Sequence, residues 1–153
     1  MRRRLLLSNL LAALLIWPLP VVAQVEGSAP FSTAGTTAEE VDRALDGLRA
    51  ALVAGDRAGV AAMVEYPLRA WDGRRSLKIK TAQQLEEKFD RIFDRSLRAT
   101  IAKASAATAF ANWQGVMFDD GRIWLRADAD GGTLRIVTIN EPAASAAAES
   151  AVP

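Results

Sequence analysis

Between residues 37 and 104, apolar side chains recur mostly at intervals of three and four, which is the period of an amphipathic helix. The first run begins at Thr37, where Glu40 completes a capping-box pattern three residues later. Gly55 ends the run, so we predict a helix that extends to about Ala54. The apolar stripe of this helix comprises Val41, Leu45, Leu48 and Leu52.

Two more segments follow the same period. Asp56 caps a short second helix, and Pro67 closes that region. Thr81 and Gln84 form another capping-box pattern, and Asp94 restarts the helix that follows, which ends at about residue 104. The apolar residues are Val60, Met63 and Val64 in the first segment, and Leu85, Phe89, Ile92, Phe93, Leu97 and Ile101 in the second.

After residue 108 the period shortens to two, which is typical of strands. The predicted strands are a hairpin at residues 68–71 and 75–80, and a meander at 114–119, 122–128 and 133–140. Asp72-Gly73 suits a type I′ turn, Asp120-Gly121 turns the first strand pair of the meander, and a longer loop joins the last two strands. Because short loops make neighbouring strands antiparallel, we predict an α+β fold with N-terminal helices packed on an antiparallel sheet.

The N-terminal end has the three parts of a secretory signal peptide at residues 1–23. Arginines at 2–4 precede an apolar run at 5–16, and small residues lead to a cut between Ala23 and Gln24. We therefore expect a periplasmic or secreted protein. With no cysteine for a lipid anchor and no second apolar segment long enough to span, we expect no membrane attachment after cleavage.

The rest of the chain divides by composition. Residues 24–35 contain serine, glycine and proline and are predicted to be a linker. Residues 36–140 are predicted to form one α+β domain. Residues 141–153 are mostly alanine, serine and proline, a composition typical of a disordered tail.

Removal of the predicted signal peptide changes the sign of the net charge. The chain has 19 basic and 18 acidic residues, and three of the basic ones lie in the signal peptide. The mature chain therefore has 16 basic and 18 acidic residues, which argues against nucleic-acid binding. Residues 69–103 are nonetheless locally positive, with ten basic and five acidic side chains. Either they favour an anionic ligand or partner, or they form a solvated surface.

The chain has neither cysteine nor histidine. This excludes Cys–His and Ser–His–Asp catalysis and zinc sites of the usual Cys/His type. The acidic loop at residues 128–132 lacks the remaining ligands of a calcium loop. No cofactor, metal site or catalytic residue is assigned from the sequence.

The order of elements resembles the nuclear-transport-factor-2-like superfamily, the cystatin-like α+β cone. Four segments are similar to small exported bacterial members of undefined activity: AGDRAGVAAMVEYPLRAWDG, FDRIFDRSLRATI, NWQGVMFDDGRIWL and LRIVTIN. The resemblance implies a strongly curved sheet wrapped around helices. In enzymes of the superfamily, the wide mouth of this cone holds a pocket with an Asp beside a His or a Tyr. This chain departs from that pattern because it has no histidine.

Tyr66 is the only tyrosine, and two interpretations remain open for it. Its hydroxyl could stabilise a developing oxyanion in an apolar cone. Alternatively, Tyr66 is a core aromatic whose hydroxyl is satisfied at the rim. If the segment is extended, Glu65 points to the other side and cannot serve as its base.

Two arginines lie in strands with apolar surroundings, Arg69 and Arg126. Either could bind a carboxylate in a bidentate manner. The alternative is a surface position, with the aliphatic stem packed and the charged head in water. Arg69 is a candidate ligand-binding residue, and Arg126 is a candidate interface residue.

Three aromatic residues, Trp71, Phe89 and Trp113, could line an apolar ligand pocket or could simply belong to the core. Trp124 shares one face of its strand with Arg126, while Ile123 and Leu125 share the other. If the aliphatic face is the core, Trp124 lies on the outer face. The resemblance then implies a dimer interface there.

We expect a non-catalytic exported domain that binds a small apolar or anionic ligand, or a protein partner, in the cell envelope. One alternative is an isomerase- or cyclase-like enzyme acting on a small hydrophobic molecule in the cone. Another is a homodimeric interaction module without a pocket. The enzyme requires an ionisable group inside an open cone, whereas the interaction module requires a filled cone and an exposed aromatic patch.

Overall fold

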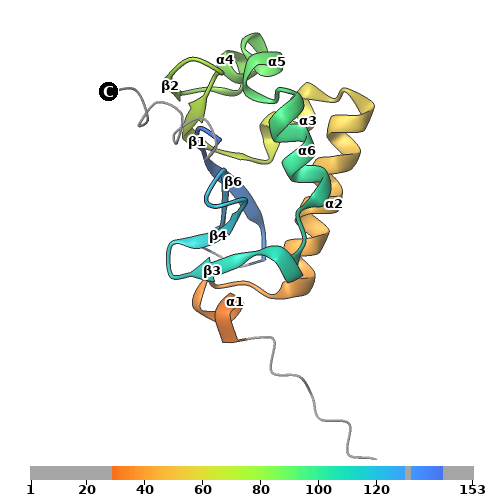
Figure 1. Cartoon of the computed structure of the whole chain (residues 1–153), viewed down its shortest axis with the longest axis vertical. Helices are drawn as coiled ribbons and strands as arrows, with labels where there is room; N and C mark the ends of the chain where they lie inside the picture. The colour runs from red at the N-terminus through yellow and green to blue at the C-terminus, as the bar shows by residue number, and fades with distance from the viewer. Residues whose placement is uncertain (1–28, 130–131, 143–153) are drawn as a thin grey trace, which may run out of the picture.

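A computed structural model describes residues 29–129 and 132–142 of the chain (Figure 1). The predicted signal peptide, and the predicted tail apart from residues 141 and 142, lie outside this part. The helices are α1 (Ala29–Thr33), α2 (Ala38–Ala54), α3 (Arg57–Ala62), α4 (Ala82–Glu87), α5 (Phe89–Ile92), α6 (Arg95–Lys103) and the 3-10 turn η1 (Ala106–Thr108). The strands are β1 (Val64–Trp71), β2 (Ser76–Ile79), β3 (Phe110–Asn112), β4 (Gly115–Phe118), β5 (Ile123–Ala127) and β6 (Leu134–Ile139).

The predicted capping signals form the helix ends. Thr37 accepts a hydrogen bond from the backbone N–H of Glu40, whose carboxylate accepts one in return from the Thr37 N–H. Gly55 ends α2 in the left-handed conformation, with φ of 69°. The side chains of Asp56, Thr81 and Asp94 each accept one backbone N–H at the start of α3, α4 and α6. The predicted caps therefore located the starts of four helices correctly.

The strands form one six-stranded sheet in the order β2-β1-β6-β5-β4-β3, which confirms the α+β class. Four of the five strand pairs are antiparallel, but β1 and β6 run parallel. The prediction of a wholly antiparallel sheet is therefore wrong at this junction. The reason is that helices and four strands separate β1 from β6 in the chain, so no short loop determines their relative direction.

The two Asp-Gly pairs behave differently. At Asp120-Gly121 the predicted turn forms: both residues have positive φ, 50° and 87°, and the Arg122 N–H donates to the Asp119 carbonyl, as in a type I′ turn. At Asp72-Gly73 only the glycine has positive φ, so the type I′ turn predicted there is wrong. The Asp72 carboxylate instead accepts hydrogen bonds from the backbone of residues 74 and 75, which holds a wider loop between β1 and β2.

Helices α2, α3 and α6 lie on one side of the sheet, α4 and α5 lie by β2, and α1 lies by β3 (Figure 1). No helix of the described residues covers the other side. The inner face carries Leu68 and Ala70 on β1 and Ile123 and Leu125 on β5, each at most 2% exposed. They pack with the apolar stripes of α2, α5 and α6 in a single core cluster. No helix in the described part of the chain is long and apolar enough to cross a membrane.

Three element boundaries differ from the prediction. Helix α1 lies within the predicted linker at residues 24–35, and Phe31 is buried in the core, so the domain begins before residue 36. Val64, predicted in the second helix, begins β1. Strand β3 was not predicted, because its three residues are too few to show a period of two.

Candidate functional site

A row of paired residues crosses the whole uncovered face of the sheet. Each member is the register partner of the next, so their side chains share one side of the sheet. We call this the outer row: Lys78, Arg69, Thr138, Trp124, Met117 and Phe110. It is basic at the β2 edge and apolar at the β3 edge. The outer row lies on the side of the sheet opposite the packed core.

A hollow of about 440 Å³ lies on this face, and we call it the outer hollow. It is open to the surface, and polar groups supply most of its lining. Its lining includes the side chains of Glu65, Arg69, Trp124, Arg126, Thr138 and Asn140. Strands β1, β5 and β6 therefore bring Arg69, a predicted ligand-binding residue, together with Trp124 and Arg126, the predicted interface pair.

The two arginines of the outer hollow are held differently. Arg126 forms a short ion pair with Glu65 across the strands. The Arg69 guanidinium instead donates a 3.4 Å hydrogen bond to the neutral side-chain oxygen of Asn140. Within the described residues, Arg69 forms no ion pair. The outer hollow therefore has one compensated and one uncompensated positive charge.

Trp124 is half-buried, and its indole lies toward the β4–β5 turn. A methyl group at Gly121 would come within 3.2 Å of the indole nitrogen and 3.7 Å of the Met117 sulfur. Gly121 thus provides both the turn conformation and the space beside the ring. The inference that Trp124 and Arg126 lie on the outer face, opposite Ile123 and Leu125, is confirmed.

The side chain of Tyr66 lies away from this hollow. Its hydroxyl donates a 3.1 Å hydrogen bond to the Ala61 carbonyl, and its ring packs against the core. Burial, and then the nearby charge of Glu86, raise the pKa of the Tyr66 hydroxyl above its usual value. The neutral, locally bonded form is therefore favoured, as expected for a core aromatic.

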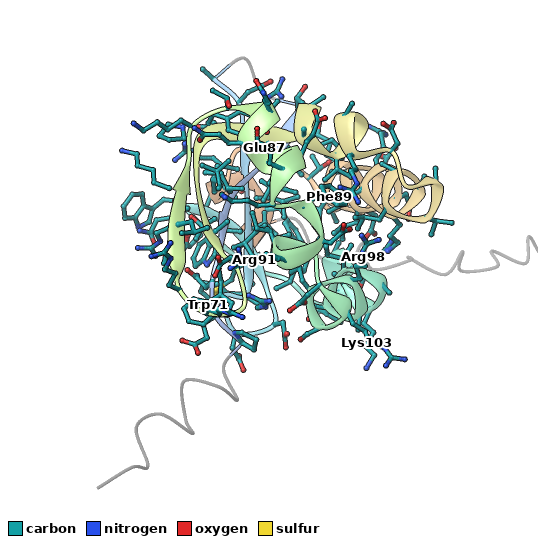
Figure 2. The ribbon with its side chains drawn as sticks, turned by 90° about the horizontal axis from the view of Figure 1, so that it is seen from above. Trp71, Glu87, Phe89, Arg91, Arg98 and Lys103 are labelled. Carbon is teal, nitrogen blue, oxygen red and sulfur yellow. The ribbon has the colours of Figure 1, made fainter. Side chains whose placement is uncertain are left out.

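Phe89 belongs to the core. It is 2% exposed and stacks on Phe93 with ring centroids 4.9 Å apart. The guanidinium carbons of Arg57 and Arg98 lie 5.3 and 5.7 Å from its ring centroid. Figure 2 shows Phe89 close to Arg98 among the helices and well apart from Trp71.

The other two aromatic candidates do not join Phe89 around a pocket. Trp71 is half-buried at the end of β1, and Trp113 is 77% exposed in the turn between β3 and β4. The hollows found in the described part of the chain open at its surface, and none is lined by Phe89, Trp71 or Trp113. The three aromatic residues predicted to line a cone pocket therefore lie apart from one another.

Asp72 is a buried carboxylate that sequence analysis did not single out. Its side chain is 1% exposed and accepts a 2.6 Å hydrogen bond from Arg91 (Figure 2 labels this arginine). Burial raises the pKa of Asp72, but the backbone N–H groups of Arg75 and Arg74, with the charges of Arg91 and Arg75, outweigh it. The net pKa lies below the usual value, so the group stays ionised and ties the hairpin to α5.

Arg122 is the opposite case. It is 1% exposed, and its three guanidinium nitrogens have no hydrogen-bond partner among the described residues. The nearest carboxylate oxygen belongs to Asp94, at 3.9 Å. Burial lowers the pKa of Arg122, while Asp94, Asp119 and Glu141 act against that change. Arg122 does not line any of the hollows described above, so we do not assign it to the site.

Glu65, Thr138 and Asn140 were not predicted as parts of the site. Alternation along β1 places Glu65 on the outer face. In β6 a register irregularity breaks the alternation, so Thr138 pairs with Trp124 on the outer face although Leu134 and Ile136 are buried, and a period of two could not show this. Among the described residues, no group of three acidic side chains is placed to hold a metal ion.

Comparison of the chain with family models, curated proteins and solved structures found no significant match.

Proposed function

We propose that this chain is an exported, non-catalytic binding domain of the cell envelope that binds a protein partner through the outer face of its sheet. One observation carries the proposal. The outer hollow gathers Arg69, Arg126 and Trp124 at the surface, while the opposite face is filled by apolar side chains.

The resemblance to the cystatin-like cone is part of this proposal. The element order of helices, hairpin, helices and four strands supports it, as does the position of α2, α3 and α6 on one face of the sheet. Export rests on the signal-peptide pattern at residues 1–23. N-terminal sequencing of the exported protein should begin at Gln24, and an uncleaved chain would contradict this part.

The isomerase- or cyclase-like alternative has less support. It requires an ionisable group in an enclosed apolar cavity. Tyr66 donates its hydrogen bond to a backbone carbonyl, and Glu65 pairs with Arg126 on the other face. Neither group is therefore placed for acid–base chemistry in the interior.

Photocrosslinking in the producing cells tests the proposal. A photoreactive phenylalanine analogue replaces Gln114, an exposed residue that lines the outer hollow. The control places the same analogue at Arg43, which is exposed on α2. We expect a discrete crosslinked protein from position 114 and none from position 43. Equal crosslinking from both positions, or from neither, would contradict a binding surface on the sheet.

A further inference from the structure

We propose that the partner presents a short acidic segment of extended polypeptide, which lies across the outer face from β5 to β2. This inference rests on the proposed function and specifies the chemistry of its partner. It follows from the distribution of unpaired charge, the shape of the surface and the position of the exposed aromatic residues.

The charge near the β2 edge is positive and uncompensated. Five basic side chains lie on β1, β2 and the residues beside them, and none forms an ion pair within the described part of the chain. They are Arg69, Arg74, Arg75, Lys78 and Lys80. The carboxylate of the turn, Asp72, faces inward to Arg91. The face thus attracts carboxylates, although the mature chain has a small net negative charge.

The surface is long enough for a peptide. A second hollow of about 390 Å³ adjoins the outer hollow, and the two share Pro67 and Arg69. Lys78 lines the far side of the second hollow, and Arg126 lines the far side of the first. Three strand spacings separate β5 from β2. At about 4.8 Å each, they span about 14 Å, the length of roughly four to five extended residues.

The arrangement of apolar groups favours a peptide over a lipid surface. A membrane-binding face has apolar side chains that protrude among the basic ones. Here Trp124 is half-buried beside Gly121, and the strongly exposed aromatics, Phe110 and Trp113, lie at the β3 edge of the sheet. None of the strongly exposed large apolar side chains of the described residues lies at the basic end of the row, beside the two hollows.

Fluorescence anisotropy measures the binding. The probe is a fluorescein-labelled hexapeptide of alternating glutamate and leucine with both ends capped, added to the exported protein. We expect saturable binding that weakens as salt is raised, and no binding of the matching glutamine-leucine peptide. Removal of two contacting charges by Arg69→Gln with Lys78→Gln should lower affinity at least about tenfold.

The matched control is Arg95→Gln with Lys103→Gln, which removes the same charge from exposed positions on α6. It should change affinity less than about twofold, and melting curves should show that both variants fold. An equal loss in both pairs would overturn the proposal, because it would indicate charge attraction without a site. Binding to phosphatidylglycerol vesicles in place of the peptide would also overturn it, as would a second copy of the chain occupying the face in sedimentation equilibrium.

The crosslinking experiment distinguishes failure of the acidic-partner inference from failure of the proposed function. Crosslinking from position 114 without peptide binding would retain the binding surface and overturn the acidic partner. Absence of both would overturn the proposed function itself.

Discussion

The two faces of strand β5 have opposite environments. Ile123 and Leu125 are at most 2% exposed and lie in the core, whereas Trp124 and Arg126 alternate with them and line an open hollow. The inner face packs against apolar side chains of the helices. The other carries an uncompensated arginine, an ion pair and an indole at the surface.

We therefore expect the inner face to determine the stability of the fold and the outer face to determine binding. Burial of apolar area on the inner face supplies the main driving force for folding. Polar side chains on the outer face contribute little to it, because exposed ion pairs are worth about 0–1 kcal/mol. Substitutions on the two faces should therefore have effects of different size and of different kinds.

The largest effect is expected in the core that packs against the inner face of the sheet. Phe89→Ala removes a ring that stacks on Phe93 and lies beside Arg57 and Arg98, so the free energy of unfolding should fall by about 3–5 kcal/mol. Urea denaturation followed by circular dichroism measures it. Phe110→Ala, at an outer position that is 54% exposed, is the control and should cost less than about 1 kcal/mol. Similar losses in both variants would refute the division between the faces.

The next largest loss of stability is expected at Asp72, directly after the end of β1. Asp72→Ala removes the carboxylate that binds Arg91 and two backbone N–H groups, and should cost about 1–3 kcal/mol. Asp72→Asn keeps an acceptor and serves as the milder comparison. If both variants were as stable as the native protein, the buried carboxylate would not hold the hairpin.

The pH dependence of the Asp72 effect has a definite sign. Since the folded-state pKa of Asp72 is lowered, its ionised form stabilises the native state above the unfolded pKa of about 3.9. That contribution is lost as pH falls through the lower, folded value. The stability gap between native protein and Asp72→Asn should therefore be constant near pH 6 and narrow below about pH 4. A gap that widened on acidification would contradict this assignment.

A smaller effect, of opposite sign, is expected at Arg122. This buried guanidinium lacks hydrogen-bond partners in the described part, and its nearest carboxylate oxygen is 3.9 Å away. Arg122→Met should leave the unfolding midpoint unchanged or raise stability by about 1 kcal/mol, since an apolar side chain avoids the desolvation penalty. Thermal melting measures the change, with Arg98→Met as the half-buried comparison. A loss above about 1 kcal/mol would instead assign a stabilising role to the Asp94 pair.

The elements that could be predicted from sequence depend on local patterns. Thr37 with Glu40, and Thr81 with Gln84, identify helix starts because a cap is satisfied within four residues. The Asp120-Gly121 turn could be predicted because an Asp-Gly pair readily adopts the two positive φ values found there. The parallel pairing of β1 with β6 could not be predicted in this way, because it depends on how distant segments pack.

The same limit applies to the site. Alternation along β5 was sufficient to place Trp124 and Arg126 on the outer face. It could not show that Glu65 pairs with Arg126, because the two residues are 61 positions apart and meet only through strand order. It also could not show that Phe89 is enclosed by Arg57 and Arg98, so Phe89 was a candidate for a pocket that the structure does not form around it.

The smallest effect is expected within the outer hollow itself. Arg126→Gln removes the ion pair with Glu65, whose side chain is 41% exposed while that of Arg126 is 50% exposed. Water and salt screen such a pair, so the free energy of unfolding should change by less than about 0.5 kcal/mol. A double-mutant cycle with Glu65→Gln, measured by urea denaturation, gives the coupling between the two side chains. A coupling above about 1.5 kcal/mol would mean that the outer face helps to hold the fold. A coupling near zero leaves Arg126, like Arg69, without a structural role large enough to explain its place in the hollow, and makes recognition of a partner the better account of both arginines.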